Sequence, residues 1–145
     1  MKFLLINQFF SPDDAPTGQL LADVARALAA EGHSVTVVCS RTVYAGGGAN
    51  PDLPGIEVQR LRTTSFGHGN TPRLAAYASF LAGAFWRAVF GPRPDVILTL
   101  TTPPLLSLAG SFVKLLRGAK HFIWEMDVYP DIATDVGFKI GRAHV

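Results

Sequence analysis

Short apolar segments alternate with segments of helical periodicity along this chain, and the alternation constrains the fold more than any other feature. The apolar segments lie at residues 3–6, 34–40, 56–61, 95–100 and 121–126. All but the third are apolar at nearly every position, which is typical of strands covered on both faces. Segment 56–61 alternates between apolar and polar residues, so it is expected nearer an edge. The pattern predicts an α/β fold with a doubly wound parallel sheet.

The segments between these strands have the periodicity of helices. The apolar face of the first helix is expected to consist of Leu20, Leu21, Val24, Ala25 and Leu28. Gly32 is expected to end this helix, and Gly118 the last of the three. Residues 74–90 and 105–116 are predicted as the second and third helices, and the second is nearly uncharged.

Composition excludes several classes of protein. The 145 residues are 48% hydrophobic and 17% charged, which is enough apolar material for the core of one domain. A net charge of +2 is too small for a nucleic-acid-binding protein, but it suits an anionic substrate or membrane surface. Cys39 is the single cysteine, so a disulfide scaffold is excluded and a cytoplasmic location is expected.

A ligand site is expected in the loops that follow the carboxyl ends of the strands. The first of these loops, residues 7–18, is long for a strand-to-helix connection and lacks the Gly-x-Gly-x-x-Gly pattern of a dinucleotide site. Ser40 and Arg41 stand where a nicotinamide-dependent oxidoreductase would need an acidic residue, so that class is not favoured.

Thr17 and Gly18 are predicted to form the mouth of the first helix. Free backbone N–H groups and the helix dipole favour an anion at such a mouth, and glycine would let a phosphate come close. The alternative is that Thr17 only caps the helix. If the mouth holds a phosphate, Gly18→Val is expected to weaken use of the donor and to leave folding nearly intact.

Several stretches, in order, carry a resemblance to a known family. They are "NQFFSPDDAPTGQL", "SRTVYAGG", "GIEVQRLRTTSFGHGN", "RPDVILTLTTPPL" and "WEMDVYPDIATDVG". Together they resemble the amino-terminal half of family 4 glycosyltransferases with the GT-B fold, in particular the bacterial branch that builds surface polysaccharides. The resemblance covers residues 1 to about 139 and implies a Rossmann-like domain that binds the acceptor.

The resemblance also implies an activity. Enzymes of this family transfer a sugar, with retention of configuration, from a nucleotide-diphosphate donor to an acceptor, and they need no metal or other cofactor. Their second domain binds the nucleotide sugar; it is expected to be absent here, so that the fragment alone has little or no activity. By position, Thr17 and Gly18 would approach the donor diphosphate. The last residues, 140–145, resemble a translated sequencing adapter and are expected to be a non-native tail.

Asp127 is the candidate catalytic residue. It follows the last predicted strand, where a carboxylate could orient or deprotonate an acceptor hydroxyl. The alternative is a turn residue that bonds its own backbone. Asp131 and Asp135 are interpreted as a helix start and a solvated face rather than as metal ligands beside Asp127, so no metal site is predicted.

Four further residues are candidates for contact with the acceptor. Tyr44 precedes three glycines and could belong to a lid, and His68 lies in a second glycine-rich loop. Thr101 and Thr102 follow the fourth predicted strand, where their hydroxyls would either line the cleft or cap the next helix. His121 begins a strand and is expected to be structural.

Residues 73–90 combine aromatic side chains with arginines near both ends, which suits contact with the inner face of the cytoplasmic membrane. The alternative is a helix packed on the sheet. A lipid-linked or glycan acceptor would fit such a membrane contact. A different class of function also remains open, namely a stand-alone Rossmann-like module that binds a phosphorylated ligand without catalysis.

Overall fold

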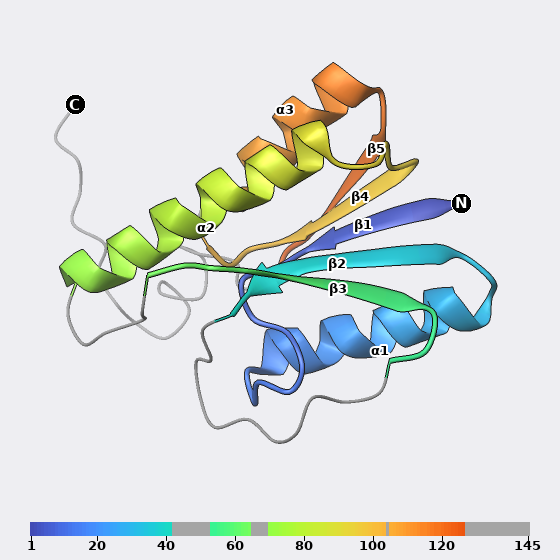
Figure 1. The fold of residues 1–145 in the computed structure, drawn as a ribbon, viewed down its shortest axis with the longest axis horizontal. Helices are drawn as coiled ribbons and strands as arrows, with labels where there is room; N and C mark the ends of the chain where they lie inside the picture. The colour runs from blue at the N-terminus through green and yellow to red at the C-terminus, as the bar shows by residue number, and fades with distance from the viewer. Residues whose placement is uncertain (42–52, 65–69, 104, 127–145) are drawn as a thin grey trace, which may run out of the picture.

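The computed structural model describes residues 1–41, 53–64, 70–103 and 105–126, which form a sheet with helices on both faces (Figure 1). The five strands are β1 (Lys2–Ile6), β2 (Ser34–Ser40), β3 (Ile56–Leu61), β4 (Val96–Leu100) and β5 (Lys120–Trp124). The three helices are α1 (Pro16–Ala30), α2 (Asn70–Phe90) and α3 (Leu106–Arg117). The predicted boundaries agree to within one or two residues, apart from the starts of α1 and α2.

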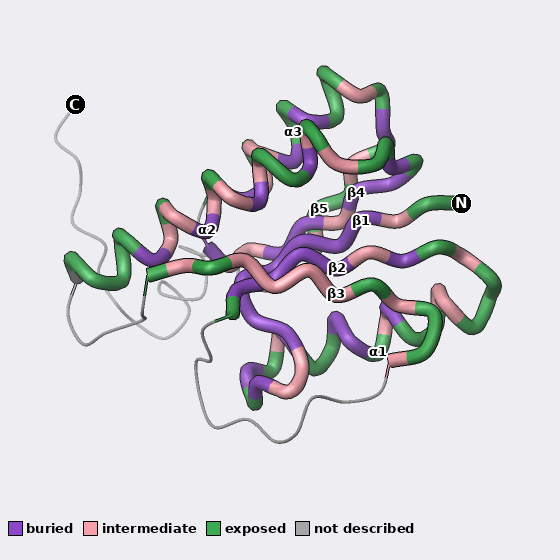
Figure 2. The backbone as a smooth tube through the Cα atoms, viewed as in Figure 1, coloured by how far each residue is buried: buried purple, intermediate pink, exposed green. Residues whose placement is uncertain are grey.

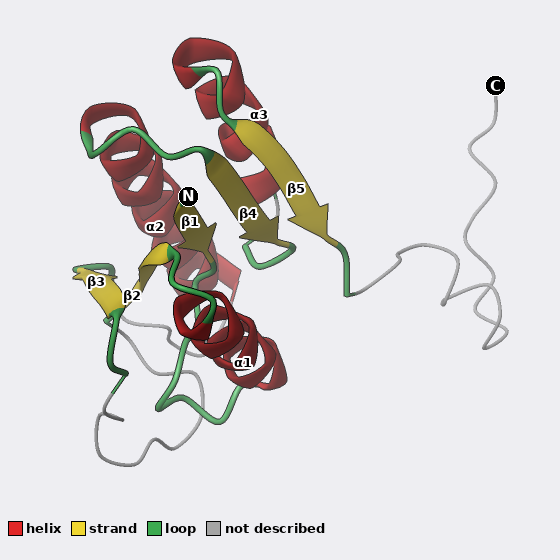
Figure 3. Ribbon diagram, turned by 90° about the vertical axis from the view of Figure 1, so that its right-hand side faces the viewer, coloured by secondary structure: helices red, strands yellow, loops and turns green. Residues whose placement is uncertain are grey.

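The sheet has the strand order β3-β2-β1-β4-β5, and every neighbouring pair is parallel. Helix α1 covers one face, whereas α2 and α3 lie side by side on the other (Figure 3). The chain winds outward from β1 to β3, returns through α2, and winds outward again from β4 to β5. The doubly wound parallel sheet is therefore confirmed, with β3 at an edge, and the winding direction changes between β1 and β4.

Two apolar clusters hold the layers together, and the central strands are the most buried part of the chain (Figure 2). Between the sheet and helices α2 and α3, the largest buried side chain is Phe80. On the α1 face, Leu21 and Ala25 pack against β1 and β2 together with Phe10 from the first loop. The first loop thus contributes to the core, although its sequence is largely polar.

The predicted apolar face of α1 is wrong at one position. Leu20 is 41% exposed, and the buried stripe of the helix instead contains Gly18, Leu21, Ala22 and Ala25. Since the helix lies close to the sheet, the small residues at positions 18, 22 and 25 are the ones that fit beneath it. Gly32 and Gly118 follow their helices with φ of 81° and 68°, which confirms both predicted helix ends.

Strand β5 departs from the expectation that both faces of the sheet are covered. Phe122 is 56% exposed and Ile123 is 47% exposed, although these residues point to opposite faces of the strand. Within the described residues no strand pairs with the outer side of β5, since β5 ends the strand order.

Cys39 on β2 is fully buried, and burial raises the pKa of its thiol from 9.0 to about 11, against the opposing effect of the Arg60 guanidinium. Below pH 9 the thiol is protonated in both the folded and the unfolded chain. Between pH 9 and 11 the unfolded chain loses this proton first, so the group reduces stability as pH rises through that range. We expect Cys39→Ala to lack this part of the alkaline decline, as measured by denaturant unfolding at several pH values.

Candidate functional site

The carboxyl ends of β1, β2 and β4 are joined through Gln8, the second residue after β1. The Gln8 N–H donates to the Thr102 carbonyl over 3.2 Å, and the Gln8 carbonyl accepts from the Ser40 N–H over 2.8 Å. The loop after β4 is thereby bonded to the loop after β1 at the point where the winding direction changes. This is the place where ligands of open α/β sheets bind.

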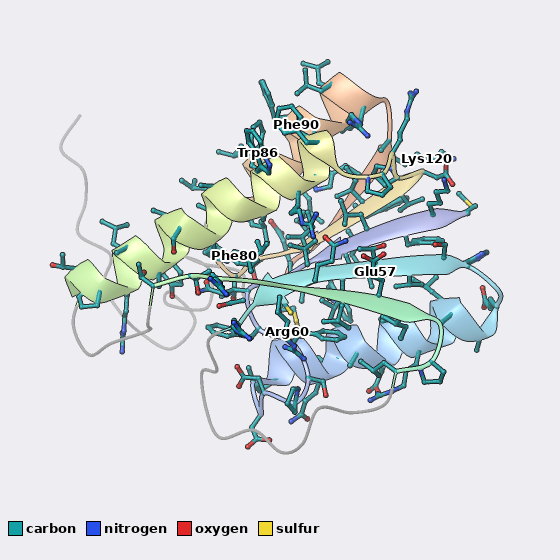
Figure 4. All side chains as sticks on the ribbon, viewed as in Figure 1. Glu57, Arg60, Phe80, Trp86, Phe90 and Lys120 are labelled. Atoms are coloured by element: carbon teal, nitrogen blue, oxygen red, sulfur yellow. The ribbon has the colours of Figure 1, made fainter. Side chains whose placement is uncertain are left out.

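The first loop is folded onto the sheet and is held in place from several sides. Phe9 and Phe10 are buried, and the Asp13 carboxylate accepts from the Ala15 N–H over 3.2 Å. From the neighbouring edge of the sheet, Arg60 of β3 donates to the Ser11 carbonyl over 2.6 Å (Figure 4). A loop fixed in this way can hold polar groups in a defined position.

Three buried polar atoms at this edge have no hydrogen-bond partner in the described part of the chain. They are Asn7 Oδ1, Gln8 Oε1 and Thr101 Oγ1. Asn7 and Gln8 are 0% and 1% exposed. A buried polar atom that lacks a partner costs about 1–3 kcal/mol, so a concentration of such atoms marks a site whose partners come from a bound molecule. The two amide oxygens only accept hydrogen bonds, so they call for a ligand rich in O–H or N–H donors.

Thr17 does not cap α1, which rules out the structural alternative considered for this residue. The N-cap position is occupied by Ala15, and no side chain caps the helix. Instead the Thr17 hydroxyl accepts a long hydrogen bond of 3.4 Å from Asn7 Nδ2, whose other acceptor is the Phe9 carbonyl at 2.7 Å. Thr17 thus belongs to the same group of polar residues as Asn7.

Gly18 lies beneath the first loop rather than at an open helix mouth. Its N–H donates to the Ala15 carbonyl over 2.9 Å, and Pro16 has no N–H. A Cβ atom at position 18 would lie 3.1 Å from the backbone N and Cα of Phe10. Close approach of the loop therefore requires glycine here, and the expectation that Gly18→Val leaves folding intact is wrong. The donor-phosphate role of Thr17 and Gly18 stays a prediction.

The structure brings together three of the predicted site residues and leaves the others outside its described part. Thr17, Thr101 and Thr102 meet through Asn7 and Gln8. The predicted residues Tyr44, His68 and Asp127 lie outside the described residues.

Asn7, Gln8 and Arg60 were missed by the sequence-based prediction of the site. The two amide side chains could have been found because they directly follow a fully apolar strand. Arg60 could not, because only the fold shows which loop it reaches.

His121 is confirmed as a structural residue. Its Nε2 lies 2.8 Å from Thr99 Oγ1 and its Nδ1 lies 3.3 Å from Ser111 Oγ, so the ring joins β5 to β4 and α3. Burial, and to a lesser degree the Lys114 ammonium, lower the pKa of His121. The neutral ring is therefore favoured, as its packing against Gly110 requires.

Two other kinds of site were also considered. A cavity of about 250 Å³ lies at the opposite edge of the sheet, near the amino ends of β1 and β2, and is lined by Lys2, Ser34, Glu57 and Arg87, among others. It is thus remote from the switch point. In residues 1–41, 53–64, 70–103 and 105–126, no three His, Cys, Asp or Glu side chains are grouped so that they could hold a metal ion.

The fold and the polar group between β1 and β4 define a Rossmann-like ligand-binding domain. The sequence profile of the glycosyl transferase 4-like domain matches residues 17–139, and the chain belongs to this family. The match begins at Thr17 and includes α1 and all later elements, whereas Asn7 and Gln8 precede it. A search of curated proteins finds no match to the chain. No helix in the described part of the chain is long and apolar enough to span a membrane.

Proposed function

We propose that this chain is the acceptor-binding half of a retaining glycosyltransferase. In this proposal a sugar passes from a nucleotide-diphosphate donor, which is a substrate rather than a cofactor, to a lipid-linked or glycan acceptor. The observation that carries the proposal is the group of unpartnered buried atoms of Asn7, Gln8 and Thr101 at the switch point. Sugars present several hydroxyl donors on one face, which is the kind of partner that these acceptor atoms lack.

Each residue of the site has a distinct role in this proposal. Thr101 and Thr102 bind hydroxyls of the acceptor, and Asn7 and Gln8 orient them from the buried side of the loop. Thr17 and Gly18 approach the donor diphosphate across the start of α1. Asp127 deprotonates or orients the attacking hydroxyl, and Tyr44 and His68 complete the acceptor site.

The location of the protein follows from the same proposal. Nucleotide sugars are made in the cytoplasm, and a lipid-linked acceptor would be met at the inner face of the cytoplasmic membrane. Residues 73–90, which belong to α2, supply a peripheral contact with that membrane. The assignment to bacterial surface polysaccharides rests on the resemblance of the sequence.

Calorimetry on the purified 145-residue chain tests the acceptor role. The acceptor probe is a sugar linked to a short, water-soluble prenyl diphosphate, and the donor probe is UDP-glucose. We expect the acceptor probe to bind and UDP-glucose to bind weakly or not at all, since the donor domain is a separate unit. Binding of prenyl diphosphate without its sugar, as tightly as with it, would instead support a module that binds phosphorylated ligands. Binding of NADH would contradict both.

A further inference from the structure

Helix α2 has an exposed apolar stripe on the side turned away from the sheet. Phe80 points toward the sheet and is buried, whereas Trp86 and Phe90 point away from it (Figure 4). Trp86 is 63% exposed and its ring lies 4.2 Å from that of Phe90. The exposed stripe repeats every fourth residue and consists of Leu74, Ala78, Ala82, Trp86 and Phe90.

Helix α3 continues this apolar area. Its inner stripe contains Leu106, Gly110 and Val113, and all three are buried. Phe85 of α2 and Phe112 of α3 have ring centroids 5.5 Å apart, so the two helices form one continuous surface. The exposed apolar side chains on and just before α3 are Leu105, Leu108, Phe112, Leu115 and Leu116. We call these five residues and the α2 stripe the α2–α3 outer surface.

Charge around the α2–α3 outer surface has one sign. From Val58 to Trp124 the chain carries eight Lys and Arg residues and a single acidic residue, Asp95. Neither α2 nor α3 contains an Asp or Glu, and exposed Arg87 and Lys114 lie on these helices. A second copy of the chain docked on the same surface would bring like charges together, whereas an anionic partner would be attracted.

We propose that the α2–α3 outer surface docks onto an anionic lipid bilayer and turns the carboxyl edge of β1 and β4 toward the headgroups; the value of this orientation rests on the proposed function. The apolar side chains enter the interface, with aromatic rings at headgroup depth and Lys and Arg against the lipid phosphates. The contact therefore involves both helices and is not confined to residues 73–90. Since no described helix can span a membrane, the domain lies on the bilayer.

The geometry of the site gives this orientation a purpose. Helices α2 and α3 run antiparallel to the strands, so both helices begin at the carboxyl edge of the sheet (Figure 1). Leu105 follows Thr102 by three residues, has a left-handed φ of 71°, and is 64% exposed. A bulky residue in this conformation is strained, and such strain is commonly kept where the side chain has a function. A lipid-linked acceptor held in the bilayer would thus reach Thr101 and Thr102 directly.

Sedimentation with lipid vesicles tests the docking surface. The purified chain is mixed with vesicles of equimolar phosphatidylglycerol and phosphatidylcholine, and with vesicles of phosphatidylcholine alone. We expect preferential binding to the anionic vesicles. Leu115→Gln and Lys114→Gln should each weaken it about fivefold, because one loses apolar contact and the other a lipid-phosphate contact. Leu20→Gln on α1 is the matched control, since it removes an exposed leucine from the opposite face of the sheet.

Two results would overturn the docking surface. One is equal binding by the Leu115→Gln and Leu20→Gln variants. The other is concentration-dependent dimerisation in size-exclusion chromatography that Leu115→Gln abolishes, because the surface would then bind a second copy. Both measurements omit the sugar acceptor. Loss of acceptor binding in calorimetry with intact vesicle binding would therefore count against the proposed function alone.

Discussion

Gly18→Val should destabilise the domain by about 3 kcal/mol, near the upper end of the usual cost of overpacking. A Cβ at this position would meet the backbone of Phe9 and Phe10 at 3.1–3.2 Å, and valine adds two methyl groups to it. Backbone atoms cannot swing aside as the end of a flexible side chain can. The loop is also held by the buried rings of both phenylalanines and by the Arg60 contact to Ser11, so it cannot retreat without losing these contacts. Urea unfolding followed by circular dichroism measures the change.

Thr17→Val is the matched control for Gly18→Val. It places the same β-branched residue in the first turn of α1, but position 17 is only partly buried. The variant loses one long hydrogen bond of 3.4 Å, so we expect it to cost about 1 kcal/mol or less. A Gly18→Val variant as stable as Thr17→Val would show that the loop is free to move away from α1, and the site would then lack the fixed support described above.

The fold could be predicted from the sequence because parallel strands buried on both faces leave a clear pattern. Segments 34–40 and 56–61 were predicted with their exact bounds, and the polar alternation of the second correctly placed it at an edge. Helix ends at Gly32 and Gly118 were predicted because a left-handed residue after a helix favours glycine. These features depend on residues close together in the chain.

The parts that could not be predicted depend on contacts between distant segments. Leu20 fits an apolar helical face by spacing alone, and only the close approach of α1 to the sheet shows that Ala22 takes its place. Gly18 was interpreted as an open phosphate mouth, because no sequence pattern reveals that Phe10 folds back over it. The exposure of Phe122 and Ile123 likewise depends on what lies beside β5 and not on their own sequence.

The site was predicted in part, for a related reason. The carboxyl edge of the sheet and the residues Thr17, Thr101 and Thr102 followed from the winding rule. Asn7 and Gln8 were not singled out, because amide side chains after a strand are common in turns. What distinguishes these two is that their amide oxygens are buried without a partner in the described part of the chain, and burial is a property of the folded chain.

Thr101→Val should weaken binding of the acceptor probe about tenfold and stabilise the domain at the same time. Valine has nearly the shape of threonine but lacks the hydroxyl, which here is buried and has no partner among the described residues. Removing it relieves a desolvation cost of about 1 kcal/mol in the free protein. In the complex the same hydroxyl would bond the sugar, so its loss lowers affinity. Calorimetry gives the first effect, and thermal or urea unfolding of the free chain gives the second.

Thr99→Val is the control that separates function from structure in this experiment. Thr99 lies on the same strand, is fully buried, and bonds His121 Nε2 over 2.8 Å. The same substitution there leaves a ring nitrogen without its partner, so we expect a loss of stability of about 1 kcal/mol and unchanged acceptor binding. The two variants should therefore move stability in opposite directions, with only Thr101→Val affecting the ligand. A loss of stability in Thr101→Val would show that its hydroxyl is already satisfied within the chain, and the main observation behind the acceptor site would fail.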